Sequence, residues 1–377
     1  MREIYLDNCA TTQADKDAAE LAAYVMQTCY GNPSSLHKKG IEAEAVLTEA
    51  RRRLAAVLGC EPESAFFTSG GTESNNLAIF GAVSANKRGG NTVVTTAWEH
   101  SSVLKPVREL ERRGFTVKAI NPEPCGHIDV DKLAALTDEN TVLVSCMLVN
   151  SELGSVADIE RLVKLVKQRN GKTLVHCDAV QGFGKLPFSA EKLGVDLLSV
   201  SGHKTYAPKG VGALYMKKTA RVSPLVFGGG QEKQIRPGTE ALPLIAAFGL
   251  AAETARKNIA ANLTHATELF EHFVKKSALV ENLCMNSPPD STPYICNASL
   301  IGFRSETVMH YLAAKGIYIS SGSACGKGKP SHMLKAAGFP QKRIDSALRV
   351  SFSKHTTIDE IDAFFLALSQ AQKEIIV

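Results

Sequence analysis

The sequence predicts an α/β fold, with a large domain built on a mostly parallel sheet and a second, smaller domain of mixed strands and helices. From about residue 41, short apolar runs alternate with helical stretches, and each run is followed by a loop of Gly, Asn, Asp or Ser. Such a repeat is typical of a parallel sheet that helices cover on both faces. The chain has 377 residues, well above the roughly 100–150 residues of a typical single domain, so we expect two domains.

The expected elements follow this alternation in order. Residues 41–58 carry Ala, Glu, Arg and Leu at helical spacing, and residues 73–83 form a second helix. A long helix from 243 to about 276 leads out of the first domain, and residues 358–375 form the last helix. The apolar runs predicted as strands are 65–68, 91–96, 116–120, 141–149, 173–177 and 196–200.

The composition excludes several classes of protein. Apolar residues make up 44% and charged residues 21% of the chain, which excludes a disordered chain, a coiled coil and a collagen-like fibre. Lys and Arg outnumber Asp and Glu by 43 to 38, and a net charge of +5 over this length is too weak to indicate nucleic-acid binding. The longest apolar stretch, about residues 242–252, is shorter than the roughly 18 residues that a membrane span needs.

The beginning of the chain and its cysteines indicate a cytoplasmic protein. Asp7 stands where the apolar core of a signal peptide would begin. The nine cysteines are odd in number and include no Cys-x-x-Cys pair, which argues against a disulfide framework and a zinc ribbon. The histidines show no metal-ligand spacing, so no metal site is expected.

Three loops that follow predicted strands or open helices carry residues suited to chemistry. Lys204, in the run SGHK, lies at a strand end among small residues, where loss of water makes an amine usable for a Schiff base. Gly71 and Thr72 open a predicted helix, where backbone N–H groups and a hydroxyl can hold a phosphate. Asp178 ends a buried strand, where a carboxylate can pair with a protonated pyridine nitrogen. Each has an ordinary alternative: a surface lysine, a capped helix start and a helix-capping acid.

Two further residues are candidates for moving protons or sulfur. His100, after the strand at 91–96, can stack on an aromatic ring and transfer protons near neutral pH, although a single histidine is more often structural. Cys325 lies in the run SSGSACGKGKP, with Lys327 and Lys329 close by. Exposure and nearby cations favour the thiolate, which is the reactive form; the alternative is a plain surface thiol.

Taken together, these motifs resemble those of the cysteine desulfurases, the NifS/IscS-like branch of the class V aminotransferases. The resemblance covers essentially the whole chain, with the motifs in the same order. They are YLDNCATT at 5–12, GNPSS at 31–35, SGGTESNN at 69–76, EH at 99–100, VNSELG at 149–154, DAVQ at 178–181, SGHK at 201–204, GGGQE at 228–232, RPGTE at 236–240, the Cys325 segment and LRVSF at 348–352.

The resemblance implies a fold-type-I homodimer that uses pyridoxal 5′-phosphate (PLP), with a mixed, mostly parallel sheet in the large domain. It implies a large domain over 16–255, and a small domain over 1–15 and 256–377 that carries the cysteine loop at about 320–331. Lys204 would hold the cofactor as a Schiff base, and Asp178 would pair with its ring nitrogen.

The resemblance also implies roles for the other motif residues. Gln181 would hydrogen-bond the ring hydroxyl of the cofactor, and His100 would stack on the ring and carry protons. Asn150 would contact cofactor and substrate, and Arg349 would hold the substrate carboxylate. The implied phosphate ligands are Gly71, Thr72, Ser201 and His203, with Thr239 reaching the site of the partner subunit.

The implied activity is the conversion of L-cysteine to L-alanine, with the sulfur taken up by Cys325 as a persulfide. An acceptor protein, such as an iron–sulfur scaffold or a sulfur carrier, would then receive that sulfur for cluster assembly or for thiolation of tRNA or a cofactor. Two departures stand out: Cys9 replaces the usual Ala, and the Cys325 segment is about two residues shorter than in housekeeping members. The shorter segment bears on which acceptor is served.

Two alternatives remain open from the sequence. One is a selenocysteine lyase or another PLP enzyme of the class V aminotransferase type, which would not need Cys325. The other is a catalytically silent scaffold for iron–sulfur assembly. The presence of Lys204, Asp178, His100 and Cys325 together argues against the silent scaffold, because such a protein has no need of all four.

Overall fold

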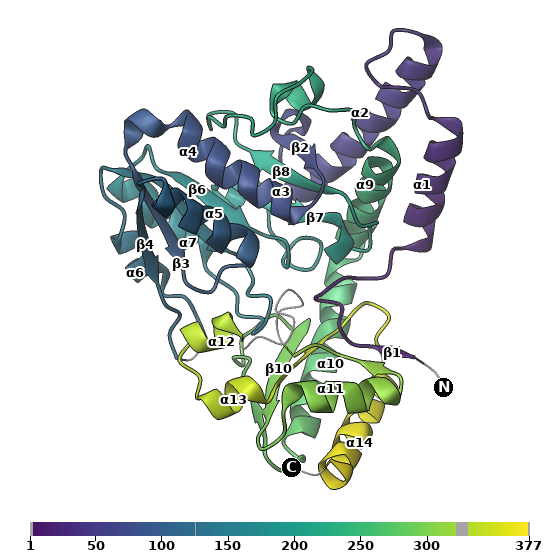
Figure 1. Ribbon diagram of the computed structural model, residues 1–377. Helices are drawn as coiled ribbons and strands as arrows, with labels where there is room; N and C mark the ends of the chain where they lie inside the picture. Colours follow the sequence, from purple (N-terminus) through teal and green to yellow (C-terminus); the bar gives the residue numbers. More distant parts are fainter. Residues whose placement is uncertain (1–2, 125, 322–330, 376–377) are drawn as a thin grey trace.

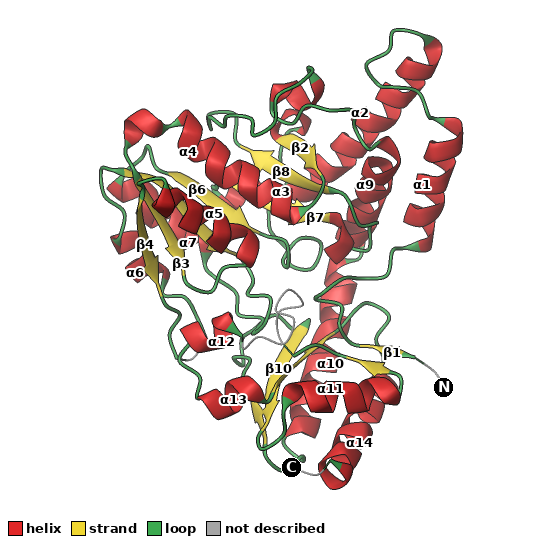
Figure 2. Cartoon of the chain, in the orientation of Figure 1, coloured by secondary structure: helices red, strands yellow, loops and turns green. Residues whose placement is uncertain are grey.

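The computed structural model describes residues 3–124, 126–321 and 331–375. Figures 1 and 2 show a layered part built around one large sheet and, below it in the same view, a second part with its own strands and helices. Both ends of the chain lie at the second part. No helix in the described ranges is both long and apolar enough to cross a membrane.

Seven strands form the large sheet, in the order β2-β8-β7-β6-β5-β3-β4. Neighbours from β4 to β7 pair in parallel, whereas β8 runs antiparallel to both β7 and β2. The sheet is therefore mixed and mostly parallel, as predicted. The strands are β2 (Ala65–Thr68), β3 (Thr92–Thr96), β4 (Thr116–Ile120), β5 (Thr141–Met147), β6 (Leu174–Asp178), β7 (Leu197–Ser201) and β8 (Gly212–Met216).

Helices cover both faces of this sheet. Successive side chains of a strand point to opposite faces: Leu197 packs in the apolar cluster that contains α5, and Leu198 packs in the larger cluster that contains α1, α2, α7 and α9. Figure 1 shows α3, α4 and α5 in front of the sheet. The helices are α1 (Lys16–Thr28), α2 (Lys38–Leu58), α3 (Gly71–Asn76), α4 (Ala82–Ala85), α5 (Ser101–Arg112), α6 (Val130–Ala135), α7 (Ile159–Arg169), α8 (Ala190–Leu193) and α9 (Leu242–Lys257).

Two helices differ from the sequence prediction. The helix expected at 73–83 consists of α3, a π-helical turn at Leu77–Gly81 and α4. The single helix expected from 243 to about 276 is wrong, because it is two helices, α9 and α10 (Ile259–Ser277), that break at Asn258. The Asn258 side-chain amide donates to the Thr254 carbonyl at 2.9 Å. Such a local bond offers the backbone an alternative to continuing the helix.

The second part has its own small sheets and apolar core. Strands β9, β10 and β12 form an antiparallel sheet, and β1 pairs in parallel with β11. Ile4 and Leu6 pack in the same apolar cluster as Phe273, Leu312 and Phe364. The elements are β1 (Ile4–Tyr5), β9 (Leu283–Met285), β10 (Ile295–Leu300), α11 (Ser305–Ala314), β11 (Ile317–Tyr318), α12 (His332–Ala336), α13 (Gln341–Asp345), β12 (Ala347–Ser351) and α14 (Ile358–Glu374).

The chain between β1 and α1 connects the two parts (Figure 1). The Ser351 backbone N–H donates to the Leu6 carbonyl at 2.7 Å, and the Thr12 N–H donates to the His203 carbonyl at 2.9 Å. This segment is therefore fixed to β12 of one part and to the loop after β7 of the other. Its residues form a wall where the two parts meet.

Candidate active site

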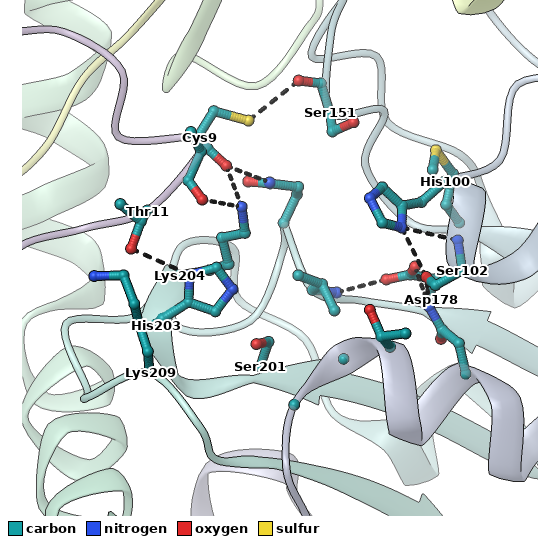
Figure 3. A pocket seen from close by; sticks show the side chains of 18 of the residues that line it. Cys9, Thr11, His100, Ser102, Ser151, Asp178, Ser201, His203, Lys204 and Lys209 are labelled. Atoms are coloured by element: carbon teal, nitrogen blue, oxygen red, sulfur yellow. Dashed lines mark hydrogen bonds between the residues drawn. The ribbon is translucent and has the colours of Figure 1, made fainter. Parts of the chain in front are cut away.

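A cavity of about 550 Å³ lies where the carboxyl ends of β6 and β7 meet the start of α3 and residues 9–11. Figure 3 shows Lys204 and Cys9 on one side of it and His100 and Asp178 on the other. Side chains from both parts of the molecule line it. The sequence-predicted site residues among them are Gly71, Thr72, His100, Asp178, Gln181, Ser201, His203, Lys204 and Arg349.

Three predicted site residues are not among those that line this cavity. Asn150 uses its side-chain oxygen to accept the backbone N–H groups of Glu152 and Leu153, at 2.9 and 2.8 Å. Thr239 is exposed at the surface. Cys325 lies outside the described residues.

Lys204 lies in the 3₁₀ turn that follows β7 (Gly202–Lys204), and its amine points into the cavity. The Lys204 Nζ donates to the Cys9 carbonyl at 2.6 Å and to the Ala10 carbonyl at 2.5 Å. The Gln181 Nε2 donates to the same Cys9 carbonyl at 3.0 Å. The wall formed by residues 9–11 thus orients both side chains.

Asp178 is the last residue of β6, and two donors fix its carboxylate. The Asn75 Nδ2 donates to Oδ2 at 2.7 Å, and the Val180 N–H donates to Oδ1 at 3.0 Å. Asn75 Nδ2 also donates to the Ser102 Oγ at 2.8 Å. The carboxylate is held in the cavity wall as a fixed negative group, which can pair with a protonated ring nitrogen.

His100 precedes α5 and is connected to the same network. Its Nδ1 accepts the Ser102 backbone N–H at 3.1 Å and lies 2.7 Å from the Ser102 Oγ. Because Nδ1 is the acceptor, the neutral ring carries its proton at Nε2. Burial lowers the pKa of His100, while the charge of Asp178 opposes that shift. The neutral ring therefore keeps its N–H at Nε2, which the Ser102 contacts do not use, and this N–H can serve as a proton donor.

The start of α3 and the end of β7 form a cradle for a small anion. A Cβ on Gly71 would lie 2.8 Å from the Val180 Cγ2 and 3.4 Å from the Ser201 Cβ, so glycine leaves space there. The Ser201 Oγ is buried and has no hydrogen-bond partner among the described residues. A buried hydroxyl of this kind is satisfied when a ligand oxygen accepts from it.

His203 lies beside this cradle and its Nδ1 is 3.2 Å from the Thr11 Oγ1. Burial lowers the pKa of His203 to about 4, and the positive charge of Lys204 adds to this shift. The ring is thus neutral at physiological pH. It can donate a hydrogen bond to an anion without adding a charge.

Arg349 comes from β12 of the second part and is almost fully buried, with 2% of its surface exposed. Its Nη2 donates to the Asp7 Oδ1 at 2.9 Å, and its Nη1 donates to the Ser151 carbonyl at 3.0 Å. A guanidinium held in this way can bind a carboxylate through two parallel hydrogen bonds. Arg349 and Lys204 therefore bring a guanidinium group and an amine to the same cavity.

The motifs did not assign roles to several residues that build the site. Asn75 and Ser102 fix Asp178 and His100, Asp7 fixes Arg349, and the Cys9 thiol donates to the Ser151 carbonyl at 3.1 Å. For Asn75 a signal was present: it follows Gly71 by four residues on a helix, so both face the same side. Asp7 and Cys9 depend on contacts between segments far apart in the sequence, whereas Ser102 contacts His100 two residues before it and Asn75 of α3.

Comparisons with other proteins agree with this arrangement. The aminotransferase class-V family profile matches residues 4–364. The chain belongs to the class-V aminotransferase family. The cysteine desulfurase IscS of Vibrio atlanticus is 39% identical over 367 residues, which are 95% of this chain and 90% of that protein.

Solved structures of relatives share the fold over almost the full chain. A NifS-like protein has a TM-score of 0.94 and 35% identity, and the match covers 99% of this chain and all of that one. A second structure, of SspA in complex with cysteine, has a TM-score of 0.83 and 30% identity, with 94% of this chain and all of that one covered. The predicted fold-type-I architecture is confirmed.

Class-V aminotransferases use PLP, and the cavity fits this cofactor. The partnerless Ser201 hydroxyl and the space at Gly71 suit its phosphate, and the Asp178 carboxylate suits its ring nitrogen. The Lys204 amine suits its aldehyde carbon. The residues that would hold PLP are Gly71, Thr72, Asp178, Gln181, Ser201, His203 and Lys204.

Proposed function

We propose that this protein is a PLP-dependent cysteine desulfurase, which converts L-cysteine to L-alanine and transfers the sulfur through Cys325. The observation that carries the proposal is the presence of Lys204 and Arg349 in one cavity, one from each part of the molecule. The relatives support it, because their names are those of cysteine desulfurases and one similar structure holds cysteine.

Different residues of the chain would bind the substrate and transfer protons. Arg349 binds the substrate carboxylate and sets its orientation, and the Lys204 amine takes a proton from the α-carbon. When bound, PLP supplies an electron sink for the bonds that break at the substrate. Asp178 would pair with the ring nitrogen of the cofactor, and His100 would donate a proton from Nε2.

Cys325 would act on the substrate sulfur as a thiolate. The bond between the substrate Cβ and its sulfur breaks while a bond between that sulfur and the Cys325 Sγ forms. The substrate carbon keeps the electron pair of the broken bond and takes up a proton, which gives alanine. The products are thus one alanine and one persulfide on Cys325 for each cysteine consumed.

The proposal includes a cytoplasmic homodimer that hands sulfur to an acceptor protein. Large apolar side chains stand exposed on the loop at 225–227 and before α2: Phe227 is 85% and Leu36 is 96% exposed. A second copy of the chain that covers these two side chains would remove their apolar surface from water. All cysteines in the described part of the chain are free thiols, which suits a reducing compartment.

The test is product formation from L-cysteine in the presence of a thiol reductant. The PLP-loaded wild-type protein should release sulfide and alanine in equal amounts. Cys325→Ser should reduce both to the level of the protein-free control. Cys284→Ser, which changes an exposed cysteine elsewhere, should match the wild type. Full activity of Cys325→Ser would instead favour a selenocysteine lyase or another PLP enzyme of this family.

A further inference from the structure

Lys185 is a buried lysine that lies four residues after Gln181, in the turn that follows β6, and does not line the cavity itself. Only 6% of its surface is exposed. Its Nζ donates to the Gln181 Oε1 at 3.1 Å and lies 6.0 Å from the centre of the Tyr294 ring. Gln181, by contrast, lines the cavity. Lys185 thus contacts the site through one side chain.

The charge of Lys185 has no acidic partner among the described residues. The charged or ionisable groups that act on it are Cys9, Lys204 and Arg349, and two of these are cations. Burial, with Lys204 and Arg349 opposing its charge, lowers the pKa of Lys185 to about 8. Because an unpaired buried charge is costly, proteins seldom keep one without a compensating partner. A negative group in the cavity would supply that partner.

The hydrogen bonds around Gln181 show how Lys185 can act on a negative group in the cavity. An ammonium group has donors and no acceptor, so the Gln181 oxygen must face Lys185. The Gln181 NH₂ group therefore faces the Cys9 carbonyl, to which the Lys204 amine also donates, and from this wall of the cavity it can donate to a ligand oxygen. Without Lys185, the amide could turn over and present its oxygen to the cavity instead.

We infer that Lys185 is a positioning residue, which fixes the Gln181 amide so that its NH₂ group binds an anionic oxygen of the PLP ring. The inference rests on the proposed function. Lys185 touches neither cofactor nor substrate, and it acts through Gln181. Its positive charge also adds to the field that favours a negatively charged oxygen at that position.

The test is a double-mutant cycle on cofactor affinity, measured by absorbance titration of the cofactor-free protein with PLP. Lys185→Met keeps the length and apolar stem and removes the charge and the donors. It should weaken PLP binding at least about tenfold, because a hydrogen bond to a charged group contributes that much. In a Gln181→Leu background, the same change should have almost no further effect.

Three measurements separate this role from a structural one. Lys185→Met should not lower the melting temperature of the cofactor-free protein, since removing an unpaired buried charge relieves a cost. Lys185→Gln keeps a neutral hydrogen-bond donor and should lose less PLP affinity than Lys185→Met. If Lys185→Met does not fold, Lys185→Gln replaces it in the double-mutant cycle. Lys167→Met, which removes a lysine paired with Asp196 at 2.6 Å, should leave PLP affinity unchanged.

The outcomes distinguish this inference from the proposed function. A wild-type protein that binds no PLP would contradict the proposed function itself. Wild-type binding that Lys185→Met leaves unchanged would overturn only the role of Lys185. An equal loss with and without Gln181 would overturn it too, because the effect would not pass through that residue.

Discussion

Glu99 precedes His100 and is a buried carboxyl group next to the site. Its Oε1 accepts the Thr96 hydroxyl at 2.6 Å and the Met147 backbone N–H at 3.0 Å. Burial raises the pKa of Glu99 to about 8, and the negative charge of Asp178 adds to this shift. At neutral pH the group is therefore mainly protonated. Asp178 then carries its charge without a second negative carboxylate close by.

The raised pKa makes a prediction about stability and pH. The folded protein holds a proton on Glu99 between the ordinary pKa near 4.5 and the folded value of about 8, and the unfolded chain does not. Stability must therefore fall as the pH rises through this window, by at most about 1.4 kcal/mol per pH unit from this group. In Glu99→Gln that contribution is absent, so its stability relative to the wild type should increase from pH 5 to pH 8.

Urea unfolding of both proteins at pH 5, 6.5 and 8 measures this difference. The matched control is Glu160→Gln, on the exposed surface of α7, which should show no such trend. A constant difference between Glu99→Gln and the wild type across the three pH values would contradict a raised pKa at Glu99.

For single residues, the sequence identified those that line the cavity better than those that position the lining residues. Lys204, Asp178 and His100 belong to short motifs, and all three line the cavity. Ser102 and Lys185 act through contacts with residues two and four positions away, and no motif assigned them a role. A motif cannot show that the Gln181 side chain accepts a hydrogen bond from a buried lysine, because burial depends on the folded structure.

The elements around the site bring together segments from three parts of the chain. The loop after β7 supplies Lys204, β12 supplies Arg349, and residues 7–10 join them, because Asp7 accepts from Arg349 and the carbonyls of Cys9 and Ala10 accept from Lys204. Gly212, at the start of β8, lets the loop before α3 lie close, since a Cβ there would be 2.6 Å from the Gly70 Cα. The absence of side chains at Gly70 and Gly212 thus allows the anion cradle to lie close to the loop that carries Lys204.

Apolar runs predicted the strands well, whereas the break in a helix and the direction of a strand were harder to predict. All six predicted runs are strands, with bounds that differ by two residues at most. The antiparallel strand β8 was not predicted, because its run follows the Lys204 loop with no helix between to indicate direction. The break at Asn258 depends on one side-chain hydrogen bond, which helical spacing does not show.

The exposed loop at 225–227 gives a prediction about assembly. If a second copy covers Phe227, then Phe227→Asp places a charge in that interface and should shift the protein from a dimer toward the 40.4 kDa monomer. Sedimentation analysis measures this mass. The control is Leu279→Asp, since Leu279 is 77% exposed just after α10, and it should stay dimeric. A fully active wild-type monomer would contradict the dimer.

At the scale of the whole molecule, we propose the division into residues 16–255 and residues 1–15 with 256–377. Two observations support it: Ile4 and Leu6 pack in the apolar cluster of the second part, and the chain breaks between α9 and α10. Under this division Lys204 belongs to one domain and Arg349 to the other. Any shift of one domain against the other would then change the distance between the amine and the substrate carboxylate.

The most direct test of the central claim is the mass of the intact protein after one turnover. The PLP-loaded protein is mixed with one equivalent of L-cysteine without reductant, and alanine is measured in the same sample. We expect one alanine per chain and a mass increase of one sulfur atom, located on Cys325 by peptide mapping. Lys204→Ala should show neither change. Alanine formed without sulfur on Cys325 would contradict the proposed transfer.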